Sequence, residues 1–371
     1  MKKRAQRSAN GGNSSSGGAC GPDGNGNGNS GVTTATPKYA AIDLGTNNCR
    51  LLVAVPEDNA FRVVDSYSRI VRLGEGLAGS GGLCEDAMRR TIEALKVCAG
   101  VMARQHVVRY RAVATEACRR GGNAPQFVAR VREETGIELE TVSCEGEVTL
   151  TFAGCRPLLD GDKSFGLVLD IGGGSSELMW IDQRDGEARV AAYHSIPEGV
   201  VTLAERYGGD CIGPALYEDI IADIASHLDR FSAVADADTA TAAGDLTMLG
   251  TSGTVTTLGA MHLGLKRYDR TRVDGMVIDF DSIARLSRRL AEQDCATRSR
   301  NPCIGNDRAD LVVMGCAILE AVCRRWPVGR MRVADRGIRE GLLYGMIRED
   351  SPAAPGSVPP AGADGIRQSA N

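Results

Sequence analysis

Short apolar runs and one helical period define the first part of the chain after residue 38. Two apolar runs, 39–43 and 49–55, flank a polar turn that contains Gly45, and this arrangement is typical of a β-hairpin. Further along, apolar residues recur with a helical period over 85–104. The first half is therefore predicted to contain strands over 39–43, 49–55, 61–68, 107–114 and 138–143, and helices over 85–104, 125–135 and 147–158.

The same pattern starts again at Phe165. An apolar run ends in Asp170, a glycine-rich turn follows, and 177–181 is predicted to form a second strand. Asp43 and Asp170 lie 127 residues apart, and the same shift places Gly45 on Gly172. This weak repeat covers a hairpin rather than a whole domain. It indicates two similar α/β halves whose turns face a shared cleft.

Two further turns follow strands in the second half. The segment Gly250–Thr254 separates a predicted strand over 246–249 from a predicted helix over 255–261. Near the end of the chain, Arg336 and Gly337 separate a strand over 332–335 from a closing helix over 338–347. We therefore predict one domain over 38–160 and a second over 161–348. The flanking segments 1–37 and 349–371 have low-complexity sequences and are expected to be disordered tails.

Composition and charge restrict the function classes. The formal net charge of −4 argues against a general nucleic-acid binder, which would usually be basic. No apolar run reaches the length of about 18 residues that a membrane span requires. The basic start of the chain is followed by Gly, Asn and Ser instead of an apolar signal region, so we expect a cytoplasmic protein with no membrane partner. The 12 cysteines include no Cys-x-x-Cys pair, and we interpret most of them as small buried hydrophobic residues.

The glycine turns predict phosphate binding. Backbone N–H groups in such turns can donate to phosphate oxygens, and glycine allows close approach of the backbone. A single turn of this kind could equally be a flexible hairpin. Asp43 and Asp170 end their strands beside two of these turns, and such carboxylates are costly to bury unless they are paired or bind a metal. They are therefore candidate ligands for Mg²⁺, although each could instead cap its own turn.

Five motifs occur in a characteristic order, and together they resemble one family. They are Ala40-Ala-Ile-Asp-Leu-Gly-Thr-Asn47, Val113-Ala-Thr-Glu-Ala-Cys-Arg119, Leu169-Asp-Ile-Gly-Gly-Gly-Ser-Ser-Glu177, Gly250-Thr-Ser-Gly-Thr254 and Asp335-Arg-Gly-Ile-Arg-Glu-Gly341. This set is similar to the exopolyphosphatase/guanosine pentaphosphatase family, within the superfamily of sugar kinases, actin and heat-shock chaperone ATPases. The resemblance implies an α/β fold of two actin-like, ribonuclease H-like domains around a central cleft, with the last helix packed back on the first domain.

The resemblance also implies roles for individual residues. Mg²⁺ or Mn²⁺ would lie near Asp43, Asp170 and Glu177, and Arg119 would contact phosphate. The phosphate-binding residues would be Gly45, Thr46, Asn47, Gly172, Gly173, Gly174, Ser175, Gly250, Ser252, Gly253 and Thr254.

The catalytic carboxylate implied by the resemblance is Glu147. The family segment usually reads Ser-Gly-x-Glu-Glu-Ala-Arg, whereas this chain has Gly146, Val148 and Thr149 at three of those positions. Because of these departures, Glu145 is an alternative. Without the resemblance, Glu147 would be interpreted as a first-turn helix residue beside the helix dipole.

We therefore expect Mg-dependent hydrolysis of the terminal phosphate of inorganic polyphosphate. The alternatives are a guanosine pentaphosphate 5′-phosphohydrolase and a non-catalytic actin-like ATP- or phosphate-binding protein. The helical C-terminal domain of longer relatives is expected to be absent. A homodimer is one option for assembly. The polyphosphate tail could follow one of three basic clusters, which are Arg109, Arg111, Arg119 and Arg120; Arg69 and Arg72; and Lys266, Arg267, Arg270 and Arg272.

Overall fold

The computed structural model describes residues 36–58, 60–159, 161–351 and 366–368. The expected N-terminal tail therefore lies outside the described residues, except for Thr36 and Pro37. The expected C-terminal tail is partly described: its first two residues belong to a helix that ends at Asp350, and Arg367–Gln368 form a short strand. Main-chain pairing with an edge strand of a sheet orders this short segment.

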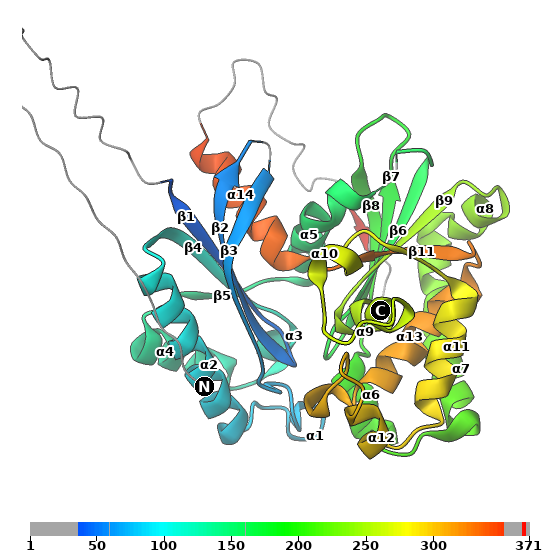
Figure 1. Cartoon of the computed structure of the whole chain (residues 1–371), viewed down its shortest axis with the longest axis horizontal. Coiled ribbons are helices and arrows are strands. Elements are labelled where there is room, and N and C mark those ends of the chain that lie inside the picture. Colours follow the sequence, from blue (N-terminus) through cyan, green and yellow to red (C-terminus); the bar gives the residue numbers. More distant parts are fainter. Residues whose placement is uncertain (1–35, 59, 160, 352–365, 369–371) are drawn as a thin grey trace, which may run out of the picture. The chain divides into compact units, whose positions relative to one another are not determined.

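A five-stranded sheet forms the first half of the fold (Figure 1). Its strand order is β3-β2-β1-β4-β5, with β1–β2–β3 antiparallel and β1–β4–β5 parallel. The strands are β1 (Lys38–Leu44), β2 (Asn48–Glu57), β3 (Ala60–Ile70), β4 (Val107–Ala114) and β5 (Leu139–Thr141). The helices that follow or separate them are α1 (Leu77–Ser80), α2 (Glu85–Arg104), α3 (Glu116–Arg120) and α4 (Ala124–Thr135).

Both faces of the first sheet are buried. Alternate residues of β1 point to opposite faces, so Ala40 and Ile42 join the core beneath α2 and α4. Tyr39 and Ala41 face the other way and join a smaller core with Leu342 and other residues of α14 (Ile338–Asp350). The closing helix of the chain therefore packs on the first sheet.

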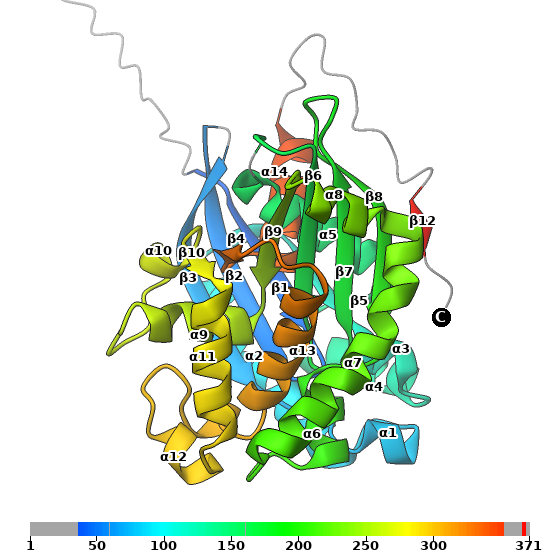
Figure 2. The same ribbon diagram turned by 90° about the vertical axis from the view of Figure 1, so that its right-hand side faces the viewer.

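A seven-stranded sheet forms the second half. Its order is β10-β11-β9-β6-β7-β8-β12, and the helices α7, α11 and α13 lie along one of its faces (Figure 2). The strands are β6 (Phe165–Ile171), β7 (Ser176–Asp182), β8 (Arg189–Ile196), β9 (Leu246–Thr251), β10 (Val277–Asp279), β11 (Arg330–Ala334) and β12 (Arg367–Gln368). The helices are α6 (Val200–Tyr207), α7 (Gly213–Ala235), α8 (Ala237–Ala242), α9 (Gly253–His262), α10 (Arg270–Val273), α11 (Phe280–Ala291), α12 (Cys295–Ser299) and α13 (Val312–Arg325), with 3-10 turns η1 (Arg156–Leu158) and η2 (Asn306–Arg308).

The helix α5 (Cys144–Cys155) crosses α14 where the chain passes from one sheet to the other. A Cβ atom added at Gly154 would lie 2.9 Å from the carbonyl carbon of Gly337, and one added at Gly341 would lie 2.8 Å from that of Leu150. The two backbones therefore touch, and glycine makes this close approach possible.

Several element boundaries differ from the prediction. The helix α5 begins at Cys144 rather than Glu147, because Ser143 caps it by accepting a hydrogen bond from the Gly146 N–H. The strand β9 continues to Thr251, since it pairs in parallel with both β6 and β11. The described helices include none with the length and apolar character needed to cross a membrane.

Candidate functional site

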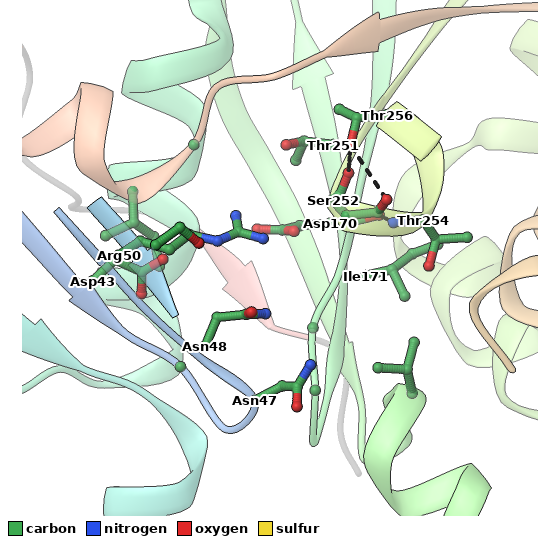
Figure 3. A pocket seen from close by; sticks show the side chains of 18 of the residues that line it. Asp43, Asn47, Asn48, Arg50, Asp170, Ile171, Thr251, Ser252, Thr254 and Thr256 are labelled. Carbon is green, nitrogen blue, oxygen red and sulfur yellow. Dashed lines mark hydrogen bonds between the residues drawn. The ribbon is translucent and has the colours of Figure 1, made fainter. Parts of the chain in front are cut away.

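A cavity of about 600 Å³ collects the glycine-rich segments of both halves. Its volume lies within the usual range for small-molecule sites. It is lined by the turn after β1, the turn after β6 and the junction of β9 with α9. Asp43 and Asp170, the two equivalent strand-end acids, both line it, and Figure 3 shows their positions.

The first turn joins β1 to β2. The Gly45 N–H donates to the Asn48 carbonyl at 2.9 Å, which closes the turn. Two amide oxygens, Asn47 Oδ1 and Asn48 Oδ1, are buried and have no hydrogen-bond partner among the described residues. A buried acceptor without a partner is costly, so these oxygens indicate a polar ligand, a cation or water in the cavity.

The second turn joins β6 to β7 and packs directly on the first. The Gly172 N–H donates to the Ser175 carbonyl at 2.9 Å. A Cβ atom added at Gly173 would lie 2.9 Å from Thr46 Cβ and 3.0 Å from the Asn47 nitrogen. The glycines of this turn do not have positive φ. Their role is therefore close approach of the two turns rather than a left-handed backbone conformation.

The third segment has a different shape from the predicted turn. Gly250 lies inside β9 and does not line the cavity, so it is not placed to bind phosphate as predicted. The turn is reduced to Ser252, which has φ 149° and ψ 173°. This conformation is unusual for a residue with a side chain and is found most often at functional sites. The Ser252 hydroxyl oxygen accepts from the N–H groups of Thr254 and Val255, so it caps α9 beside the cavity.

Glu147 enters the cavity from α5, whereas Glu145 does not line it. The Glu147 carboxylate is 2.6 Å from Arg119 Nη1, and Arg119 also donates to the Val142 carbonyl. Burial and the neighbouring Glu177 carboxylate raise the pKa of Glu147 to about 8, although Arg119 opposes this shift. A carboxylate with a pKa near neutrality can accept a proton from water under ordinary conditions.

The other acids also have raised pKa values. Burial, followed by the charges of Glu147 and Asp43, raises the pKa of Asp170 to about 7. Burial and the charge of Asp170 raise the pKa of Glu177 to about 7, while Ser175 and Ser195 lower it by donating to Glu177 Oε1. Burial raises the pKa of Asp43, and the charge of Arg50 opposes that shift.

The three candidate metal ligands are not gathered into one cluster. Within the described part of the chain, no three His, Cys, Asp or Glu side chains come together as a ligand set. Asp43 and Asp170 line the cavity, whereas Glu177 is not among its lining residues and has one buried carboxylate oxygen without a hydrogen-bond partner among the described residues. Mg²⁺ usually takes only one or two protein carboxylates and completes its shell with phosphate oxygens and water. The two cavity-lining acids fit such a cation.

Several charged residues of the cavity were not identified from the sequence, among them Arg50, Arg308 and Glu116. Arg50 of β2 reaches across the cavity toward Asp170 (Figure 3). Arg308 of η2 approaches the same point, since a Cβ atom added at Gly253 would lie 3.7 Å from Arg50 Nη2 and 4.0 Å from Arg308 Nη1. Neither arginine forms an ion pair with a described residue. Glu116 lies against Gly174 and pairs with Arg120 at 3.0 Å. One signal was available for Arg50, because it is the repeat equivalent of Glu177.

Most arginines of the predicted basic clusters already have carboxylate partners. Arg109 pairs with Glu349 and Asp350, and Arg111 pairs with Glu140. In the third cluster, Arg270 pairs with Glu340 at 2.7 Å. These arginines therefore have little unsatisfied charge to offer a polyanion.

Comparison with known proteins gives consistent matches. Residues 52–350 match the model of the Ppx/GppA phosphatase family. Among solved structures, an exopolyphosphatase-like protein has 28% sequence identity and a TM-score of 0.76, over 85% of this chain and 98% of that chain. The Ppx/GppA family member of Aquifex aeolicus has 27% identity and a TM-score of 0.70, over 86% of this chain and 100% of that chain. An exopolyphosphatase from Cytophaga hutchinsonii has 24% identity and a TM-score of 0.74, over 85% and 99% of the two chains, and supports the fold alone. The predicted α/β fold is confirmed, with one sheet in each half.

Proposed function

The chain belongs to the Ppx/GppA phosphatase family and is a phosphoanhydride hydrolase, and on this premise we propose that it is an exopolyphosphatase that removes the terminal phosphate of inorganic polyphosphate. The observation that carries the proposal is the position of Glu147. Its carboxylate is buried in the wall of the cavity that the glycine turns of both halves line, and it is held by Arg119.

Glu147 is proposed to orient a water molecule and accept its proton. A raised pKa favours this role, because the base must hold the proton during attack and release it afterwards. Arg119 fixes the direction of the Glu147 carboxylate through the bond of 2.6 Å. Because Arg119 does not line the cavity, we propose that it positions Glu147 rather than contacting phosphate as predicted from the resemblance.

The terminal phosphate is proposed to lie against the glycine turns. Backbone N–H groups of the second turn and the Gly253 N–H at the start of α9 can donate to its oxygens, and Arg50 and Arg308 supply positive charge. In line with the prediction, the proposed contacts include Thr46, Asn47, Ser175 and Thr254, which all line the cavity. Phosphoryl transfer depends mostly on positioning and charge stabilisation, and this set provides both.

Asp43 and Asp170 are the residues that would hold Mg²⁺ or Mn²⁺, with Asn47 and Asn48 as nearby neutral oxygen donors. When bound, a divalent cation would neutralise charge on the phosphate oxygens. Thr151 donates to Asp170 at 3.2 Å and limits the orientations of this carboxylate.

The proposal is tested by phosphate release from tripolyphosphate, long-chain polyphosphate and guanosine pentaphosphate in the presence of Mg²⁺. We expect the highest kcat/KM with polyphosphate. A higher kcat/KM with guanosine pentaphosphate would assign the nucleotide as the substrate. Tight ATP binding without phosphate release from any of the three would assign a non-catalytic binding protein.

A further inference from the structure

A second cavity, of about 680 Å³, adjoins the candidate site. It is bounded by the end of β3, by Arg90 of α2 and by the loop 303–308. Ser68, Cys303 and Arg308 line both cavities, so the two adjoin along these side chains. A linear ligand whose end lies in the first cavity can therefore extend past Arg308 into the second.

Guanidinium groups dominate the charge of the second cavity. Its lining includes Arg69, Arg72, Arg90 and Arg308. Arg72 is neutralised by Asp310 through contacts of 2.8 and 2.9 Å, and Arg90 pairs with Glu75 at 2.6 Å.

Arg69 and Arg308 differ from these two arginines, because neither forms an ion pair with a described residue. Arg69 is exposed on β3, and burial together with the charge of Arg50 lowers the pKa of Arg308. Two guanidinium groups that line one cavity without ion-pair partners favour an anionic ligand there.

The lining also indicates which kind of anion fits. Its only carboxylate among the described residues is Asp307, and it includes no aromatic side chain on which a nucleobase could stack. A flexible chain of phosphates requires positive charge and no stacking surface. The cavity is therefore better suited to a phosphate chain than to a nucleoside.

We propose that the second cavity binds the tail of long-chain polyphosphate, so that the enzyme distinguishes long chains from short ones through Arg69. This inference rests on the proposed exopolyphosphatase function, because it assumes that the chain end lies in the first cavity. Arg308 contacts both the terminal phosphate and the tail of the polyphosphate chain, whereas Arg69 contacts the tail alone. Loss of the Arg69 charge should therefore affect long substrates only.

The test compares Arg69→Glu with the control Arg62→Glu, which changes an exposed arginine of the same strand outside both cavities. For Arg69→Glu we expect the KM for long-chain polyphosphate to rise about tenfold and the KM for tripolyphosphate to stay unchanged, because only the long chain reaches Arg69. The control should match the wild type with both substrates. Asp307→Asn should lower the KM for the long chain, since it removes the one carboxylate of the cavity.

Affinity is measured as well, by calorimetric titration of each variant in a Glu147→Gln background with the same two polyphosphates. A selective loss of long-chain affinity in Arg69→Glu supports the tail site. Equal effects on both polyphosphates, or no effect on either, overturn it. If the wild type releases no phosphate from any substrate, the proposed function fails, while the titration still decides whether the second cavity binds the chain.

Discussion

The two strand–turn–strand units of the molecule have the same backbone pairing but differ in charge at one equivalent position. In the first half, Asp43 pairs across the hairpin with Arg50, and in the second half, Asp170 pairs with Glu177 at the equivalent position. The guanidinium opposes the rise in the pKa of Asp43, whereas Asp170 lies among carboxylates and has a pKa of about 7. Each unit thus supplies one acid to the cavity, and the first unit adds a cation. The difference indicates that the two copies of the hairpin have distinct roles, since only the first can neutralise an anionic ligand through its own side chain.

The acidic residues of the cavity should show the largest effect on the rate of phosphate release. Glu147→Gln is expected to lower kcat by two or more orders of magnitude, because the amide cannot accept a proton from water. Phosphate release measures the rate, and circular dichroism checks that the variant folds. Glu145→Gln is the matched control, since Glu145 is on the same helix but does not line the cavity. Similar losses in both variants would contradict the assignment of Glu147.

The equivalent glycines of the two turns should differ in their tolerance of a side chain. A Cβ atom at Gly172 would lie 2.6 Å from the Ser175 carbonyl oxygen, whereas one at Gly45 would lie 3.7 Å from the Asn48 carbonyl oxygen. Gly172→Ala is therefore expected to lower the free energy of unfolding by about 1–3 kcal/mol, and Gly45→Ala by less than about 1 kcal/mol. Urea unfolding measures both variants. A larger loss for Gly45→Ala would show that the turns differ in another way.

Arg50, the basic residue of the first hairpin, should affect substrate binding more than turnover. Arg50→Gln is expected to raise the KM for tripolyphosphate about tenfold, or about 1.4 kcal/mol, because it removes a charge from the cavity without changing Glu147. Steady-state kinetics separates KM from kcat. Arg62→Gln, on β3 outside the cavity, is the control. A fall in kcat with an unchanged KM would place Arg50 in the chemical step instead.

The acids should also make metal binding dependent on pH. The folded-state pKa values of Glu147, Asp170 and Glu177 are raised. The stability that these groups contribute is therefore fully present below the pKa that they have in the unfolded chain, and it is lost as pH rises through about 7–8. Once ionised, Asp170 should bind Mg²⁺ together with Asp43. We expect Mg²⁺ to raise the Tm by about 2–5 °C at pH 8 and by less at pH 6.

Asp170→Asn provides the control for this measurement, because the amide fills the same space without the charge. It should stabilise the metal-free protein at pH 8 and reduce the Mg²⁺-dependent shift in Tm. A shift of equal size at both pH values, or one that persists in Asp170→Asn, would locate the cation elsewhere.

The sequence by itself determined the family and part of the secondary structure. Runs such as 107–114 and the helical period of 85–104 predicted elements with the bounds that the structure shows, because burial of one face imposes a regular spacing on apolar residues. The repeated glycine turn predicted two similar α/β halves, because close backbone approach leaves a local signature in residue type.

Only the tertiary structure decided which side chains share the cavity. Arg308 reaches it from a segment far along the chain, whereas Gly250, although part of a motif, is enclosed within a strand. The unpaired state of Arg69 and the pairing of Arg109 with the closing helix were equally absent from the sequence pattern. Local spacing fixes how one segment folds. The neighbours of a charged group depend on strand order and helix packing, which bring together residues that are distant in sequence.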